Sequence, residues 1–480
     1  MPESSHKHLL FIDGHWCSGQ KDAWLAVDNP ATSQTVNEVA VAEIEDLDIA
    51  LNACARGFSV WRKTPAIKRA DVLLEAARLI RERLESLAQT LSLEQGKPLP
   101  EARMEINSCA ELLQWYAEEG RRACGRLVPA RDSKVINMVR RDPVGPVAAF
   151  SPWNFPASQA VRKLAPALAA GCSIILKGPE EAPGALIGVV QALVDAGLPD
   201  GVLALVFGRP AEISAHLIAS PIIRKVSFTG SVPVGKLIAT QAAQNVKPCT
   251  LELGGHAPVL VFEDVDILDC AQKLAQAKFR NAGQVCVSPT RFYIQQSVFA
   301  EFTQAFVEAV QRITIGAAQE RTTQMGPLIN QRRCAQIADL VADAKVKGAT
   351  VLTGGGPLRD SGYFFAPTVL TNVPENARAW MEEPFGPLAL LAPFNSVDEA
   401  IELANNTTFG LAAYAFSHNL AVCHRLSDEL ITGMLAINHF ALAFAETPFG
   451  GVGESGYGRE GGSEGLDVYL VNRLITQAVA

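Results

Sequence analysis

One cysteine and one glutamate lie in glycine-containing segments that suit covalent catalysis. Cys286 ends the run FRNAGQVC (279–286), and Glu252 lies in the earlier run LELGG (251–255). A thiolate is a strong nucleophile that adds readily to a carbonyl carbon. A nearby carboxylate can activate the water molecule that later releases the covalently bound product. Because most cysteines are simply small buried residues, the case for Cys286 depends on the segments that accompany it.

Two proline-flanked turns carry further polar side chains. Asn154 lies in SPWNFP (151–156), between two prolines and two aromatic residues. A rigid turn of this kind suits an amide that donates a hydrogen bond to an oxyanion. Glu383 lies in the similar turn EEPFGP (382–387), where its carboxylate can accept hydrogen bonds from ribose hydroxyls. The simpler alternatives are a packed turn at Asn154 and a helix cap at Glu383.

The run FTGSVPVGKL (228–237) closes a predicted strand and opens a predicted helix. Glycine lets the backbone approach a diphosphate, and a helix N-terminus favours negative charge. Gly230 to Lys236 also fits GxxxxGK, the start of a P-loop, but the next residue is Leu237. A P-loop needs Ser or Thr there to hold magnesium. A dinucleotide site is therefore favoured over a nucleoside triphosphatase site.

A parallel sheet is expected to position these segments. From about residue 143, apolar runs alternate with amphipathic segments. The apolar runs predict strands at 146–150, 172–177, 202–208 and 225–230. The amphipathic segments predict helices that begin near 157 and 233 and helices over 184–196 and 211–219. Such a βαβα series predicts helices on both faces of the sheet, with ligands beyond the carboxyl ends of the strands. Residues 147–256 are thus predicted to bind a nucleotide. Lys177 and Glu180 follow the second strand, where they bind a ribose and a phosphate or lie in a solvated turn.

Three other regions differ in pattern. Residues 66–120 show helical spacing and are predicted to form a surface helix bundle. A second α/β region spans about 257–445, with strands expected at 257–262 and 290–295 and helices at about 267–281 and 298–312. Segments 135–141 and 467–480 are rich in β-forming residues with no helical partner. Exposed strands of this kind are usually covered, often by another subunit.

Composition excludes several classes of function. The 480 residues include 42 basic and 50 acidic side chains without a basic run, which argues against nucleic-acid binding. Neither the N-terminal segment nor any apolar stretch resembles a signal peptide or a membrane span, so a cytoplasmic enzyme without membrane association is expected. The ten cysteines include no CxxC pair, and the eight histidines form no cluster with ligand spacing. We therefore expect no metal site and no disulfide framework.

The motifs PWNFP, FTGS, LELGG, GQVC and EEPFGP together resemble the NAD(P)-dependent aldehyde dehydrogenase superfamily, from FIDGHW (11–16) to PFGGVGESGYGREGG (448–462). The resemblance implies an α/β fold with two parallel-sheet domains and a small β-flap that joins subunits of a dimer or tetramer. It implies a cofactor-binding domain at 1–124 and 143–253 and a catalytic domain at 254–448. The flap would comprise 125–142 and 467–480, and residues 449–466 would return to the cofactor domain.

The resemblance also assigns roles to individual residues. Cys286 looks like the nucleophile and Glu252 the general base, while Asn154 and the Cys286 backbone N–H look like the oxyanion hole. The implied cofactor is NAD, with NADP possible. Lys177 and Glu180 would hold the adenosine ribose, Gly230 and Ser231 the diphosphate, and Glu383 the nicotinamide ribose. The full set of implied cofactor contacts is Ser151, Pro152, Trp153, Lys177, Glu180, Gly208, Gly230, Ser231, Val234, Leu253, Glu383 and Phe385.

Within the superfamily, the chain is similar to the succinate-semialdehyde and 2-oxoglutarate-semialdehyde dehydrogenases. In this branch two arginines clamp the far carboxylate of the substrate, which suits bidentate guanidinium groups; here they are Arg162 and Arg280. Ser288 stands where several relatives carry a second cysteine, so a disulfide switch is not expected. Succinate semialdehyde is the first choice of substrate, and 2-oxoglutarate semialdehyde or glutarate semialdehyde is the alternative.

Overall fold

The predicted βαβα series forms part of an eight-stranded sheet in the order β22-β12-β11-β8-β9-β10-β2-β3. The structure is a computed structural model that describes residues 6–359 and 361–478. The strands are β2 Leu10–Ile12, β3 His15–Cys17, β8 Val147–Phe150, β9 Ile174–Lys177, β10 Leu203–Val206, β11 Lys225–Thr229, β12 Cys249–Glu252 and β22 Gly456–Tyr457. Strands β8 to β12 pair in parallel, which confirms the sheet type predicted from the alternating pattern.

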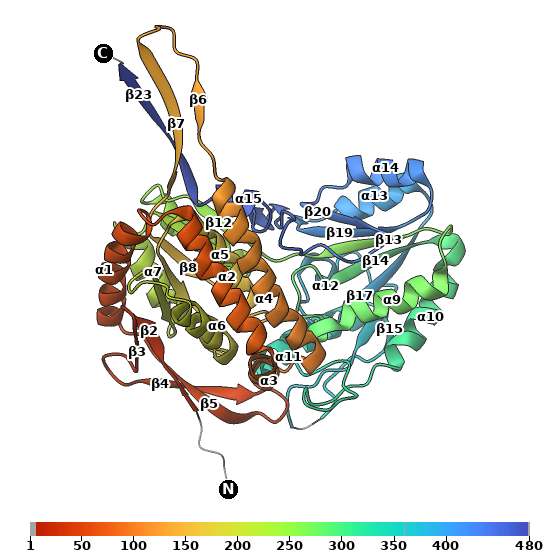
Figure 1. Ribbon diagram of the computed structural model, residues 1–480. Coiled ribbons are helices and arrows are strands. Elements are labelled where there is room, and N and C mark those ends of the chain that lie inside the picture. The colour runs from red at the N-terminus through yellow and green to blue at the C-terminus, as the bar shows by residue number, and fades with distance from the viewer. Residues whose placement is uncertain (1–5, 360, 479–480) are drawn as a thin grey trace.

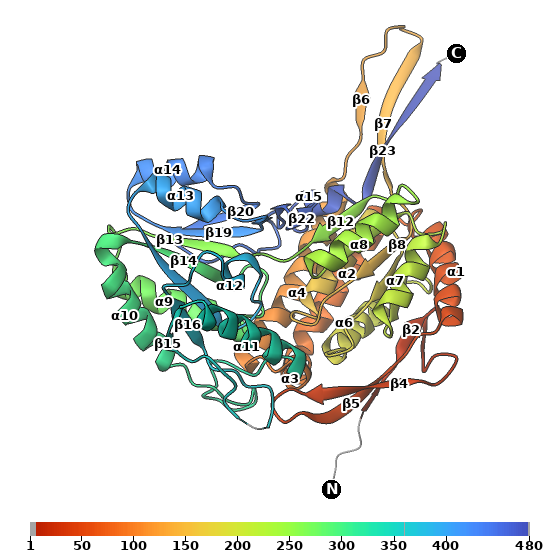
Figure 2. The ribbon, with the colours of Figure 1, turned by 180° about the vertical axis from the view of Figure 1, so that it is seen from behind.

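Helices cover both faces of this sheet (Figure 1, Figure 2). They are α1 Ile44–Trp61, α2 Ala66–Glu82, α3 Leu84–Gln95, α4 Leu99–Glu119, α5 Ser158–Ala170, α6 Gly184–Asp195, α7 Pro210–Ala219 and α8 Val232–Ala243, and a 3₁₀ turn, η1 Gly120–Arg122, follows α4. The helices predicted in residues 66–120 are confirmed and expose one side to solvent, but they do not form a separate bundle. Helix α4 packs against α5, and Ile106, Cys109 and Leu113 join the same hydrophobic core as the sheet. Helical spacing of apolar residues predicts that a helix has a buried face, but it does not identify the element against which that face packs.

A second sheet has seven strands in the order β15-β16-β17-β14-β13-β19-β20. Its strands are β13 Ala257–Val261, β14 Pro289–Gln295, β15 Thr350–Thr353, β16 Thr368–Thr371, β17 Leu388–Phe394, β19 Ala412–Phe416 and β20 Met434–Ile437. Its helices are α9 Ile267–Phe279, α10 Phe299–Gln311, α11 Gln331–Val346, α12 Arg378–Met381, α13 Val397–Asn405 and α14 Leu420–Glu429, with the 3₁₀ turns η2 Arg280–Gly283 and η3 Gln296–Val298. The α/β class is confirmed, and so are the strands and helices predicted between 257 and 312.

Three smaller sheets complete the fold. Strands β1 His6–His8, β5 Gln34–Ala40 and β4 Trp24–Asn29 form one, and β18 Phe409–Gly410 pairs with β21 Val452–Gly453 in another. The third contains β6 Arg126–Val128, β7 Val135–Pro143 and β23 Leu470–Ala478, which project from the body as an arm (Figure 1, Figure 2). Leu127, Ile136 and Leu474 on this arm expose large apolar side chains. The described residues leave out a few positions of three predicted segments. These positions are residues 1–5 of 1–124, residue 360 of 254–448 and residues 479–480 of 467–480.

The segment after residue 448 returns to the first sheet. Strand β22 pairs antiparallel with β12, which sets Gly456 opposite Glu252. The short helix α15 Glu464–Asp467 then leads into β23 of the arm. Glu252 thus lies where the chain passes from β12 to β13 of the other sheet, under the returning segment. Across the described ranges, no helix is long and apolar enough to cross a membrane.

Candidate active site

Cys286 lies in a loop that follows a sharp turn at the end of α9. The turn is the 3₁₀ segment η2, in which Asn281 and Ala282 have φ values of 48° and 54°, in the left-handed region. Two or more such residues in succession are unusual and cluster at functional sites. Gly255 lies against this loop, because a Cβ atom there would come within 2.7 Å of the Cys286 carbonyl oxygen. The LELGG and GQVC motifs are therefore in contact.

A cavity of about 160 Å³ opens beside the half-buried Cys286. Its walls include Met104, Phe155, Arg162, Arg280 and Phe449. The guanidinium group of Arg280 lies 5.5 Å from the ring centre of Phe155, and that of Arg162 lies 5.0 Å from the ring centre of Phe449. Both arginines that were predicted to bind substrate thus share one cavity with the predicted nucleophile.

Arg162 is the more deeply buried of these two arginines. It lies on α5 with 4% of its surface exposed, and its Nη2 donates to the Ala443 carbonyl at 2.7 Å. Its Nη1 is buried without a hydrogen-bond partner. Buried polar atoms are nearly always satisfied by protein or water. A buried cationic donor that lines a cavity is therefore suited to an anionic ligand.

Ser288, the third predicted substrate residue, does not line this cavity. It borders a neighbouring outer cavity of about 640 Å³, whose walls also include Arg280, Tyr414 and Phe440. Its hydroxyl accepts a hydrogen bond from the buried Lys278 Nζ at 3.0 Å. Ser288 therefore lines a different cavity from Arg162 and Cys286, and Arg280 is the charged residue that borders both cavities.

Glu252 occupies the carboxyl end of β12 with 2% exposure, and neither of its carboxylate oxygens has a hydrogen-bond partner. Burial raises the pKa of Glu252 well above its ordinary value, and the charge of Glu460 adds to the increase. Lys163, Arg459 and Arg162 act in the opposite direction. A carboxylate with a raised pKa is a stronger base once it is ionised, which suits proton abstraction from water near neutral pH.

A buried ion pair between Lys163 and Glu460 lies near Glu252, and sequence reasoning missed it. Lys163 Nζ pairs with Glu460 Oε1 and donates to Thr229 Oγ1 at 2.6 Å. Both charged side chains are almost fully buried. The available signal was weak: Lys163 stands in an otherwise apolar helix, and Glu460 in the terminal glycine-rich motif.

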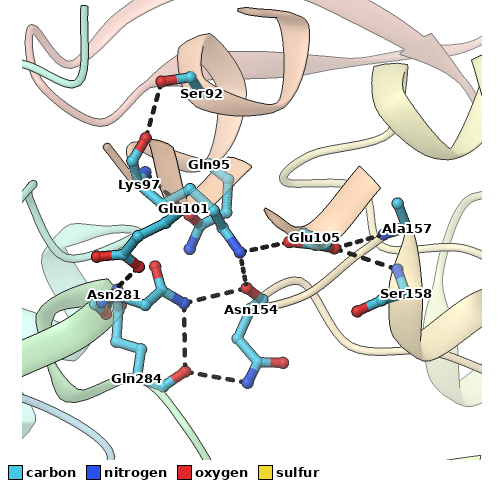
Figure 3. Close-up of polar contacts among 10 residues, drawn as sticks. All are labelled: Ser92, Gln95, Lys97, Glu101, Glu105, Asn154, Ala157, Ser158, Asn281 and Gln284. Atoms are coloured by element: carbon cyan, nitrogen blue, oxygen red, sulfur yellow. Dashed lines mark hydrogen bonds and ion pairs between the residues drawn. The ribbon is translucent and has the colours of Figure 1, made fainter. Parts of the chain in front are cut away.

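Asn154 links the SPWNFP turn to the loop that carries Cys286. It is buried, its Nδ2 donates to the Gln284 carbonyl at 3.0 Å, and its Oδ1 has no hydrogen-bond partner (Figure 3). One Nδ2 hydrogen remains for a ligand, because an amide nitrogen donates twice. Burial, together with the charges of Glu383 and Glu252, raises the pKa of the Cys286 thiol to about 12, while Arg162 acts in the opposite direction. The resting thiol is therefore protonated at neutral pH.

The residues predicted to bind the cofactor fall into two groups. At the carboxyl ends of β9 and β10, Glu180 pairs with Lys177 Nζ at 2.7 Å and accepts from the Gly208 N–H at 2.9 Å. Near Cys286, Glu383 accepts from the Gly255 N–H at 3.1 Å, and burial raises its pKa to about 7. Trp153 and Phe385 belong to the two proline-flanked turns, and their rings meet edge to face with ring centres 5.5 Å apart.

The remaining predicted contacts lie between these groups. Gly230 follows β11, and Ser231 precedes α8. The exposed Val234 lies in the first turn of that helix, and the buried Leu253 follows Glu252. Ser151 and Pro152 follow β8, and the Ser151 hydroxyl is buried without a partner. These residues bring a helix N-terminus, a glycine backbone and an unpaired hydroxyl to the carboxyl edge of a parallel sheet. Such an edge is suited to binding the phosphates and ribose of a dinucleotide.

Comparison with known proteins identifies the family. Residues 16–475 match the model of the aldehyde dehydrogenase family. The 4-(hydroxymethyl)benzenesulfonate dehydrogenase TsaD1 of Comamonas testosteroni is 46% identical over 97% of both chains. The succinate-semialdehyde dehydrogenase [NADP(+)] GabD of Escherichia coli K12 is 38% identical over 97% of this chain and 96% of that protein.

Solved structures agree with these sequence matches. The structure of a Bacillus cereus aldehyde dehydrogenase in complex with NAD+ superimposes with a TM-score of 0.96 at 34% identity, over 99% of this chain and 97% of that one. This likeness extends over both large sheets and the arm. The chain therefore belongs to the aldehyde dehydrogenase family and is an NAD(P)-dependent oxidoreductase that acts on aldehydes.

Proposed function

We propose that this enzyme oxidises an aldehyde with an anionic group at its far end, and that Arg162 and Arg280 bind this group. The observation that carries the proposal is the buried, unpartnered Nη1 of Arg162 in the cavity beside Cys286. Arg280 adds a second guanidinium to the same cavity. Guanidinium groups form paired hydrogen bonds with carboxylates and similar anions.

In the proposed mechanism, the Cys286 thiol first loses its proton to water, and the resulting thiolate attacks the aldehyde carbon and makes it tetrahedral. The carbonyl oxygen becomes an anion, which the Asn154 amide and the Cys286 backbone N–H stabilise. A single donor of this kind typically lowers the barrier by about 3 kcal/mol. When bound at the residues named above, NAD or NADP would accept a hydride from this tetrahedral carbon, and Cys286 would then carry an acyl thioester.

Glu252 serves the second half of the reaction. It takes a proton from water, the water oxygen attacks the thioester carbon, and the C–S bond breaks to release the carboxylic acid and the Cys286 thiolate. The raised pKa of Glu252 makes it a base of suitable strength. The ion pair of Lys163 and Glu460 lies near Glu252, where the charge of Glu460 raises the pKa of Glu252 and that of Lys163 lowers it.

Succinate semialdehyde is the first choice of substrate, with glutarate semialdehyde and 2-oxoglutarate semialdehyde as alternatives. The Escherichia coli relative, named for succinate semialdehyde, supports this choice. A sulfonated aromatic aldehyde is a second candidate, because the Comamonas relative is named for a benzenesulfonate. Two features of the cavity also favour an aromatic substrate. The rings of Phe155 and Phe449 form part of its wall, and its volume is similar to that of a protein cavity that binds benzene.

Cofactor choice and assembly belong to the same proposal. The Glu180 carboxylate accepts hydrogen bonds from the adenosine ribose and repels a 2′-phosphate, so NAD is preferred. Residues 1–124, 143–253 and 449–466 bind the cofactor, and residues 254–448 carry the catalytic loop. The arm at 125–142 and 467–480 joins subunits, and its exposed Leu127, Ile136 and Leu474 support this role.

Initial rates of NADH and NADPH formation across a panel of aldehydes test the proposal. The panel contains succinate, glutarate and 2-oxoglutarate semialdehydes, 4-formylbenzenesulfonate, butanal and benzaldehyde. Each anionic aldehyde thus has a neutral partner of similar carbon skeleton. We expect at least one anionic aldehyde to exceed its neutral partner by about 10-fold or more in kcat/KM. Equal kcat/KM values for anionic and neutral partners throughout the panel would refute the anionic-substrate assignment.

A further inference from the structure

A buried lysine lies behind the Asn154 turn. Lys97 follows Gly96, which ends α3 in the left-handed region with φ of 90°, and the Lys97 side chain is fully buried. Its Nζ donates to the Asn154 carbonyl at 2.8 Å and pairs with Glu105 of α4 at 2.5 Å (Figure 3). The same ammonium group lies 3.9 Å from the ring centre of Phe155. Lys97 therefore contacts two successive residues of the SPWNFP turn.

Glu105 connects this lysine to the start of α5. Its Oε1 accepts hydrogen bonds from the backbone N–H groups of Ala157 and Ser158, at 3.0 and 3.2 Å. Ala157 is the N-cap residue of α5 and has no side chain that could cap the helix. Glu105 satisfies these amides instead, so the Lys97–Glu105 pair holds the turn and the first turn of α5 together.

A second donor comes from the loop that carries the nucleophile. Asn281 Nδ2 donates to the same Asn154 carbonyl at 3.0 Å, and Asn154 Nδ2 donates back to the Gln284 carbonyl at 3.0 Å. Figure 3 shows Lys97 and Asn281 meeting at this one carbonyl oxygen. The orientation of the Asn154 amide is thus set by contacts with two separate parts of the chain.

Stability alone gives a poor reason for this arrangement. Burial of an ion pair costs desolvation free energy, and apolar residues of similar volume are often as stabilising. Burial also lowers the pKa of Lys97, against the opposing effect of Glu105. Lys97 does not line the substrate cavity, so its charge does not contact the substrate. What it does contact is the backbone of the proposed oxyanion donor.

We propose that Lys97 is a positioning residue for aldehyde oxidation: with Glu105, it fixes the Asn154 carbonyl and so aims the Asn154 amide at the oxyanion beside Cys286. This inference rests on the proposed role of Asn154 as oxyanion donor. Such donors act by being placed before the reaction begins, so a donor that can rotate stabilises the transition state less.

The first variant to measure is Lys97→Met, which keeps much of the side-chain length and removes the charge. Its companion is Lys97→Met with Glu105→Gln, which leaves no unpaired buried carboxylate and carries the test if the single variant does not fold. We expect the single-turnover rate of NADH formation to fall by about 10-fold or more. For Lys97→Met, the aldehyde KM and the NAD Kd should change by less than about threefold, because Lys97 neither lines the substrate cavity nor belongs to the proposed cofactor contacts.

A double-mutant cycle with Asn154→Ala separates positioning from a general loss of structure. If Lys97 acts through Asn154, Lys97→Met should slow the Asn154→Ala enzyme by less than about twofold, since the aimed group is already absent. Losses that multiply in the combined variant would overturn the inference while leaving the role of Asn154 intact. A normal rate for Asn154→Ala alone would overturn both the proposed oxyanion hole and the inference. An unchanged rate in Lys97→Met would overturn the inference alone.

Discussion

Replacement of Arg162 by methionine tests how the enzyme selects its substrate. Methionine retains an unbranched side chain that can still pack against Phe449, and it removes the guanidinium group. Two hydrogen-bonding functions are lost. The donor to the Ala443 carbonyl disappears for every substrate, whereas the free Nη1 is lost only for substrates that carry an anion.

The expected magnitude follows from these contacts. A hydrogen bond to a charged group contributes about 1.5–3 kcal/mol, and 1.36 kcal/mol corresponds to a factor of ten. The kcat/KM for succinate semialdehyde should therefore fall by about 10- to 150-fold relative to that for butanal. Arg162 also opposes the raised pKa values of Glu252 and Cys286, but this effect acts on both aldehydes alike and cancels in the ratio.

The assay compares kcat/KM for both aldehydes in wild type, Arg162→Met and a control, Lys273→Met. Lys273 lines the outer cavity but is exposed and paired with Asp269. Its removal should change the ratio by less than about twofold, because exposed ion pairs contribute little. Equal losses for succinate semialdehyde and butanal in Arg162→Met would show that Arg162 supports the fold or Glu252 rather than the substrate anion. A large effect of Lys273→Met on the same ratio would show instead that nearby positive charge attracts anionic aldehydes nonspecifically.

Three further predictions concern the chemistry and the cofactor. Glu252→Gln should give a burst of about one NADH per active site followed by slow turnover, and Cys286→Ala should give none; steady wild-type turnover in Glu252→Gln would exclude it as the deacylation base. Glu180→Ser should raise the kcat/KM ratio of NADP to NAD, since it removes the carboxylate that repels a 2′-phosphate; an unchanged ratio would contradict this role. Burial raises the pKa of Glu101, in the cavity wall, to about 7. Above that pH the ionised carboxylate repels an anionic aldehyde, so KM for succinate semialdehyde should rise through neutral pH, and Glu101→Gln should remove this rise without affecting butanal.

The sequence by itself determined the parts of the site whose residues are close together in the chain. The apolar runs between 146 and 230 predicted four strands of the first sheet, because buried parallel strands are continuous apolar segments. The short motifs around Asn154, Glu252 and Cys286 also pointed to covalent chemistry, since each combines a reactive side chain with glycine or proline. These signals are local and need no knowledge of distant partners.

Only the tertiary structure decided which charged residues are buried and what they contact. Lys97, Glu105, Lys163 and Glu460 look like surface charges in the sequence, yet all four are buried at the site. Lys97 and Glu105 are eight residues apart in the chain, and Lys163 and Glu460 are 297 residues apart. The free energy of a charge depends on its solvent exposure and on the nearest opposite charge. Both are set by packing, which is also why the helices of 66–120 proved to be part of the core.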